Sequence, residues 1–133
     1  MEISVVIPVF NRPELVTRAI NSVIEQSYRV MEVVVVDDGS TDKTVEQVEN
    51  QFPSASVIRQ ENRGVSSARN AGIAAATGDW IALLDSDDRW HRHKILRQVQ
   101  ALEKNPGFIA CHTDESWIRN GRHANPMKKH AKP

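Results

Sequence analysis

The chain has 133 residues, which is the size of one ordinary domain. Hydrophobic residues make up 40% of it and charged residues 26%, with 17 basic residues balancing 17 acidic ones, as in a near-neutral globular protein. This balance disfavours a nucleic-acid binder. The only basic concentration is a tail that we interpret as a solvated end, formed by Lys128, Lys129, His130 and Lys132.

The cysteine count and the hydropathy pattern bear on the compartment. Cys111 is the single cysteine, so an internal disulfide is impossible and a reducing compartment is the simpler interpretation. Apolar stretches such as Val33 to Val36 are far shorter than the roughly 20 residues that cross a bilayer. The first residues lack the basic start and the cleavage site of a signal peptide. We expect a cytoplasmic protein with no transmembrane segment, either free or peripheral to the inner membrane face.

In the first half of the chain, strand patterns alternate with helix patterns. Ile3 to Ile7 and Val33 to Val36 are β-branched runs, which predict strands buried on both faces. Between them, apolar residues at helical spacing predict an amphipathic helix, namely Leu15, Val16, Ala19, Ile20, Val23 and Ile24. Residues 40–42 are typical of a helix N-terminus, and the helix that follows has the apolar stripe Val45, Val48 and Phe52.

The second half continues the alternation. Strands are expected at Ser56–Arg59 and Trp80–Leu84, with a helix between them whose small residues suit close packing, namely Ala68, Gly72, Ala75 and Ala76. Another helix is marked by Ile95, Val99 and Leu102, and Phe108–Cys111 is a candidate strand. The pattern predicts an α/β fold with a mainly parallel sheet flanked by helices. We expect this domain to cover residues 1–113 and to be followed by an irregular segment over 114–133.

Carboxylates follow two of the predicted strands. Asp37 and Asp38 end one strand, and Asp85, Asp87 and Asp88 end another, at the edge where open parallel sheets bind ligands. Carboxylates gathered at one edge repel one another unless a cation compensates. Oxygen ligands suit Mg²⁺ or Mn²⁺, which bind through one or two carboxylates and substrate phosphates. The alternative is that each acidic pair only caps the helix that follows it.

Phosphate binding must use a device other than the common glycine motifs. Neither G-x-G-x-x-G after the first strand nor G-x-x-x-x-G-K-[ST] occurs. Phe10, beside Asn11, is apolar where a loop is usually polar, so it is either a face on which a base stacks or a plug of the core. A phosphoacceptor domain also groups aspartates at strand ends. Proteins of that class have an acidic pair after the first strand, whereas this chain has Pro8–Asn11 there, which disfavours the phosphoacceptor class.

Four motifs occur together and in order, which makes their combination specific: VVIPVFN from Val5, VDDGSTD from Val36, GVSSARNAG from Gly64 and GDWIALLDSDD from Gly78. With them the chain resembles the inverting GT-A-fold family 2 glycosyltransferases, which include cellulose, chitin and hyaluronan synthases, over residues 2 to 104. The resemblance implies a Rossmann-like GT-A fold and a nucleotide-sugar donor, first of all a UDP-sugar. It also implies a saccharide or lipid-linked acceptor.

The resemblance implies roles for residues on the nucleoside side of the site. Phe10 matches the aromatic residue that lies against the nucleobase, and Asp38 matches the carboxylate that accepts the ring N–H of the base. Asp37 is expected to support that contact. Pro8 and Asn11, in the same motif as Phe10, are counted with the donor-binding residues.

On the diphosphate side, Asp85-Ser86-Asp87 matches the family's D-x-D motif. Asp87 is expected to bind the metal, Mn²⁺ or Mg²⁺, and Asp85 to lie near the ribose or the metal, with Ser86 at the donor. Arg69 either meets a phosphate or an aspartate of the site, or forms a purely structural ion pair. Asp88 is expected behind the metal ligands, whereas His91 and His93 are expected at the surface.

The chain departs from the family's pattern in its length and in its base. Family members are longer, and their catalytic base is an acidic residue in the C-terminal half. Asp114 and Glu115 form the only acidic pair after Asp88, and they come early for that motif. We therefore expect a truncated enzyme that holds the donor site without the acceptor site. The alternative is a non-catalytic nucleotide-binding fragment.

Overall fold

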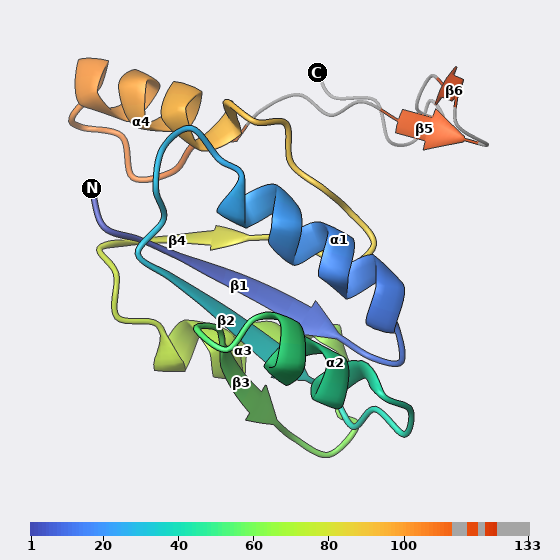
Figure 1. Cartoon of the computed structure of the whole chain (residues 1–133). Helices are drawn as coiled ribbons and strands as arrows, with labels where there is room; N and C mark the ends of the chain where they lie inside the picture. The colour runs from blue at the N-terminus through green and yellow to red at the C-terminus, as the bar shows by residue number, and fades with distance from the viewer. Residues whose placement is uncertain (113–116, 120–121, 125–133) are drawn as a thin grey trace.

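The computed structural model describes residues 1–112, 117–119 and 122–124 (Figure 1). Its main body is a four-stranded, wholly parallel sheet in the order β3-β2-β1-β4. The elements of this body are β1 Ile3–Val9, α1 Pro13–Ile24, β2 Glu32–Asp37, α2 Thr44–Gln51, β3 Ser56–Arg59, α3 Val65–Ala75, β4 Trp80–Leu83 and α4 Lys94–Lys104. The predicted alternation of strands and helices and the parallel sheet are confirmed.

The central strand β1 is buried along its whole length because both faces of the sheet are covered. Side chains of one face, including Val5 and Ile7, pack in a cluster with α1, α2 and α4. Those of the other face, including Val6, pack against Ala68 of α3. Figure 1 shows the same layers, with α1 and α2 in front of the sheet and α3 behind it.

Helix α3 lies very close to the sheet at Gly72. A Cβ atom at this position would come within 2.3 Å of Val6 Cγ1 and 3.1 Å of Val36 Cγ2. Ala68, one turn earlier, is fully buried. The close packing predicted from the small residues is therefore confirmed at these two positions, whereas Ala75 at the end of the helix is exposed.

The candidate strand at Phe108–Cys111 is wrong. Helix α4 ends in a turn in which Phe108 N–H donates to Asn105 O, and the backbone then runs without a ladder to any described strand. Without a neighbouring strand its apolar side chains gain no burial, and Phe108 and Ile109 are 62% and 91% exposed.

The segment after residue 113, expected to be irregular, contains two short strands. They are β5 Trp117–Arg119 and β6 Arg122–Ala124, and they form a separate antiparallel pair. The basic tail and the acidic pair Asp114 and Glu115 lie outside the described residues. Within the described ranges, no helix has both the length and the apolar character that crossing a membrane requires.

Candidate functional site

Three loops meet at the carboxyl edge of the sheet, after β1, β2 and β4. The parallel register pairs Val9 with Asp37, the last residues of β1 and β2, and pairs Leu83, the last residue of β4, with Val6 of β1. The loops after the three strands therefore leave from the same edge of the sheet. Most of the donor-site residues expected from the sequence lie in these loops, while Pro8 and Asp37 lie at the ends of β1 and β2. Arg69 reaches the same edge from α3.

Phe10 and Asn11 follow β1, and both are exposed. Phe10 is 43% exposed, which rules out the interpretation of this residue as a core plug. Asn11 adopts a left-handed conformation with φ 49°, which asparagine tolerates better than most residues. Its N–H donates to Ser40 Oγ at 2.8 Å, and its Oδ1 accepts the N–H of Thr41 at 2.8 Å. Asn11 therefore ties the loop after β1 to the loop after β2.

Asp38 is buried, with 6% of its surface exposed, and it organises the loop before α3. Its Oδ1 accepts from Gln60 Nε2 and from the N–H of Arg63, both at 2.8 Å, and its Oδ2 accepts from the N–H of Gly64 at 3.0 Å. Burial alone would raise the pKa of Asp38, but the hydrogen bonds from Arg63, Gln60 and Gly64 outweigh it and lower the pKa. A carboxylate offers about four acceptor sites, so these bonds leave room for one further donor.

Asp37 has a different environment from Asp38. Consecutive residues of an extended chain project to opposite faces, so Asp37 and Asp38 point to different sides of the sheet. Asp37 is buried, with 3% of its surface exposed. Its Oδ2 accepts the N–H of Ser40 at 3.0 Å, which closes the turn after β2. Gly39 in this turn has φ 88°, and a Cβ there would lie 2.9 Å from the backbone N of Asn62. Asp37 thus shapes the turn on which Asp38 depends.

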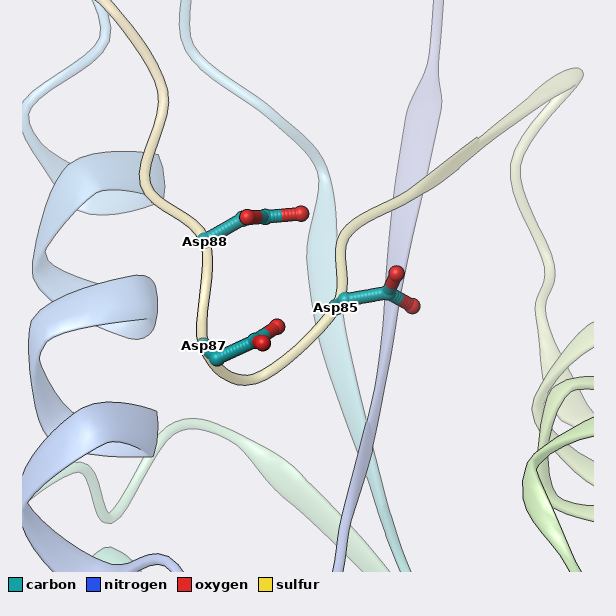
Figure 2. Close-up of side chains that lie close together, drawn as sticks. All are labelled: Asp85, Asp87 and Asp88. Atoms are coloured by element: carbon teal, nitrogen blue, oxygen red, sulfur yellow. The ribbon is translucent and has the colours of Figure 1, made fainter. Parts of the chain in front are cut away.

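The turn after β4 carries three aspartates whose carboxylates converge. Asp85, Asp87 and Asp88 each offer an oxygen, and these oxygens all lie within 4.8 Å of one another. Figure 2 shows the side chains of Asp87 and Asp88 directed toward the side on which Asp85 lies. The turn is closed by a hydrogen bond from Asp88 N–H to Asp85 O at 3.0 Å, and Ser86 between them is buried. An oxygen-only set with exposed members fits a hard, partly hydrated divalent cation.

Arginines from α1, from the residue before it and from α3 balance this acidic turn. Arg69 Nη2 lies 2.6 Å from Asp85 Oδ1, so Arg69 forms an ion pair with the first aspartate of the turn, which fits both a donor-site role and a purely structural one. Arg12 Nη1 lies 3.3 Å from Asp87 Oδ2, and Arg18 Nη2 donates to the Asp87 carbonyl at 3.0 Å. Sequence reasoning missed Arg12 and Arg18, although an arginine directly after the first motif and another in the second turn of the following helix were a usable signal.

The remaining candidates lie apart from this edge. His91 is exposed, and the ring of His93 is hydrogen-bonded to Ser27 Oγ at 2.7 Å, so neither joins the aspartate cluster. A groove of about 380 Å³ between β4 and α4 is lined by residues such as Trp80, Trp90 and Leu102 and contains none of the candidate donor-binding residues. The candidate donor-binding residues thus lie outside this groove, at the carboxyl edge of the sheet.

Comparison with known proteins identifies relatives of this chain. The sequence matches the family described as glycosyl transferase family 2 over residues 4–130. It is 45% identical over 107 residues to an uncharacterised glycosyltransferase of Nostoc sp.. That alignment covers 77% of the chain and 33% of the relative, so the chain spans about one third of that relative's length.

Solved structures give the same result. S. aureus TarS 1-349 in complex with UDP-GlcNAc superposes with a TM-score of 0.65 at 30% identity, covering 79% of this chain and 32% of TarS 1-349. The mannosyltransferase PcManGT from Pyrobaculum calidifontis, in complex with GDP-Man and Mn²⁺, superposes with a TM-score of 0.67 at 30% identity, covering 76% of this chain and 32% of that enzyme. The GT-A architecture expected from the motifs is thereby confirmed. The chain belongs to glycosyl transferase family 2.

Proposed function

We propose that this chain is the donor-binding part of a metal-dependent glycosyltransferase that transfers a sugar from a nucleoside-diphosphate sugar to a hydroxyl group with inversion. The observation that carries the proposal is the convergence of three features at one sheet edge. These are the exposed ring of Phe10, the buried carboxylate of Asp38, and the cluster Asp85, Asp87 and Asp88. Similar structures hold UDP-GlcNAc, or GDP-Man with Mn²⁺.

In this proposal the nucleoside binds between the loops after β1 and β2. The ring of Phe10 supplies an apolar surface for the base, and Asp38 accepts the ring N–H of the base with its remaining acceptor site. Uracil presents such an N–H at N3 and guanine presents one at N1, whereas adenine and cytosine present none. Of the two donors that fit, we propose a UDP-sugar, as in the similar TarS structure with UDP-GlcNAc. Pro8, Asn11 and Asp37 act by shaping the two loops.

The diphosphate binds at the turn after β4. Asp85 and Asp87 are the residues that would hold Mn²⁺ or Mg²⁺, with Ser86 between them at the donor. When bound, the divalent ion offsets the negative charge that develops on the departing nucleoside diphosphate. Arg12, on the rim of the site, presents a second positive charge to the phosphates.

Transfer would proceed by a single displacement. The acceptor oxygen forms a bond to the anomeric carbon on the face opposite the diphosphate, while the bond from that carbon to the phosphate oxygen breaks. The proton of the acceptor hydroxyl passes to a general base. Asp114 and Glu115 are the only acidic residues of this chain after Asp88 except Glu103, and their positions lie outside the described residues. We propose a saccharide or a lipid-linked saccharide as the acceptor that carries this hydroxyl group.

The roles of Asp38 and Asp87 can be separated by comparing UDP with uridine. Asp87→Asn should weaken UDP binding in the presence of Mn²⁺ by about 1–3 kcal/mol and leave uridine unchanged, because uridine lacks phosphates. The matched control is Asp79→Asn, which removes an exposed aspartate at the opposite edge of the sheet. Calorimetry that showed the same loss for uridine and UDP would contradict the assignment of Asp87 to the metal.

The second candidate function is nucleotide binding without transfer, because the donor-side residues Asp38, Asp85 and Asp87 lie within the described residues whereas the candidate bases Asp114 and Glu115 do not. A radiolabelled UDP-sugar assay distinguishes the two. We expect the 133-residue chain to bind donor and to transfer at least about 100-fold more slowly than a version extended by the C-terminal half of a relative, because general-base catalysis contributes about 10²–10⁴-fold. Rapid transfer by this chain, abolished by Asp114→Asn or Glu115→Gln, would place the base within it.

A further inference from the structure

A line of polar side chains along α1 holds the loop that leads from β4 to α4. Arg18, Ser22 and Gln26 are spaced four residues apart, so they lie on one side of the helix and its C-terminal extension. Ser22 and Gln26 are only 9% and 8% exposed, which is unusual for polar side chains that have no part in the apolar core.

Each of these side chains binds backbone groups of that loop. Arg18 Nη2 donates to the Asp87 carbonyl at 3.0 Å, and Ser22 Oγ accepts the N–H of Trp90 at 3.0 Å. Gln26 Nε2 donates to the His91 carbonyl at 2.7 Å, and its Oε1 accepts the N–H of Ile95 at 3.0 Å. The loop is thus held at Asp87, Trp90 and His91, and the start of α4 at Ile95, by one polar ladder, defined as Arg18, Ser22 and Gln26.

The position of this loop matters because its first residues carry the carboxylate cluster. Three carboxylates whose oxygens lie within 4.8 Å of one another repel, so an unrestrained turn would separate them. Arg12 and Arg69 offset part of the repulsion, but they contact the turn through exposed or partly exposed side chains. The buried attachments are made by Ser22 and Gln26, on the side of the loop toward α4.

We propose that the polar ladder of α1 positions the acidic turn, so that the affinity of the site for a divalent cation depends on Ser22 and Gln26, which do not contact the cation. This inference rests on the proposed function. Arg18, Ser22 and Gln26 are positioning residues, because they act through the backbone of residues 87–95. Hydrogen-bonded partners that orient metal ligands typically change metal affinity about 10–100-fold when removed.

The test measures the dissociation constant for Mn²⁺ alone, from the free-ion EPR signal, in the complete 133-residue chain. Ser22→Ala and Gln26→Leu should each raise this constant about tenfold. Arg18→Gln, at an exposed position, should raise it less. The matched control is Thr17→Val, which removes a hydroxyl of the same helix that donates only within α1, to Pro13 O at 2.8 Å.

Two further measurements separate positioning from general destabilisation. Uridine, which has no phosphate, should bind equally to wild type and to every folded variant, and amide exchange at Trp90 and Ile95 should accelerate in Ser22→Ala and Gln26→Leu only. If Gln26→Leu does not fold, Ser22→Ala and Arg18→Gln decide the result. Wild-type affinity for Mn²⁺ in both, despite lower thermal stability in Ser22→Ala, would overturn the inference and leave the proposed function standing. Failure of the wild-type chain to bind Mn²⁺ and UDP would overturn both.

Discussion

Replacing Asp38 by Asn is the perturbation whose effect the structure defines most closely. The two side chains have nearly the same shape, but the amide has one acceptor oxygen and one donor group where the carboxylate has two acceptors. Its oxygen is expected at the Oδ1 position, where it can still accept from Gln60 Nε2 and Arg63 N–H. The NH₂ group then faces the N–H of Gly64, which loses its acceptor.

The magnitude follows from these contacts. A polar group left unsatisfied costs about 1–3 kcal/mol, so the free energy of unfolding should fall by about 2 kcal/mol. For a domain of this size that corresponds to a decrease in Tm of roughly 6–10 °C. Uridine binding should weaken about 5- to 150-fold, measured well below the Tm, because the base loses a charged acceptor.

The assay is urea unfolding combined with uridine titration, with Asp79→Asn as the control for loss of one aspartate. If Asp38→Asn matched Asp79→Asn within about 0.5 kcal/mol of unfolding free energy, the hydrogen bonds of Asp38 would not hold the loop before α3. If it lost stability and kept wild-type affinity for uridine, Asp38 would be structural and the base would bind elsewhere.

Three other outcomes are expected. Glu32 accepts hydrogen bonds from Ser4 Oγ and from Thr77 N–H, both at 2.6 Å, and these bonds lower the pKa of Glu32 from 4.5. The contribution of Glu32 to the free energy of unfolding is therefore fully present above pH 4.5 and is lost as the pH falls through the folded-state pKa. Glu32→Gln should therefore cost about 1 kcal/mol in urea unfolding at neutral pH, and the cost should shrink as the pH falls through the folded-state pKa of Glu32; a cost independent of pH would contradict this. Arg12→Gln should tighten Mn²⁺ binding without nucleotide about 2–5-fold, because a competing cation is removed from Asp87, with calorimetry as the measurement. Gly72→Ala should lower the unfolding free energy by about 1–3 kcal/mol because its Cβ would meet Val6, whereas Gly107→Ala, which meets nothing within 4 Å, should not.

Much of the fold was predictable because its strongest signals are local. The β-branched runs of β1 and β2 are buried on both faces, so their composition alone indicates central strands. The small residues of α3 indicated close packing, and Gly72 shows the reason in its distance to Val6. The candidate strand at Phe108–Cys111 failed because strand formation depends on a neighbouring edge, which an apolar run does not encode.

The candidate site was predictable in its residues and less so in their contacts. Motif order identified Asp38, Asp85 and Asp87, but the partners of Asp38 are backbone N–H groups of a loop, and any residue type supplies those. The contact of Arg12 with Asp87 joins positions 75 residues apart, which no local pattern reveals. Polar Arg18, Ser22 and Gln26 recur every four residues along α1 and just beyond its end, and this spacing was the available sign of the polar ladder.

The central claim, a nucleoside-diphosphate site bridged by a metal, is tested most directly by calorimetry of UDP with the 133-residue chain in Mn²⁺ and in EDTA. Diphosphate and the carboxylates of Asp85 and Asp87 repel one another unless a cation lies between them. We predict clear binding in Mn²⁺ and at least about tenfold weaker binding in EDTA, with uridine unaffected by EDTA. Equal affinity for UDP in the two conditions would contradict the account.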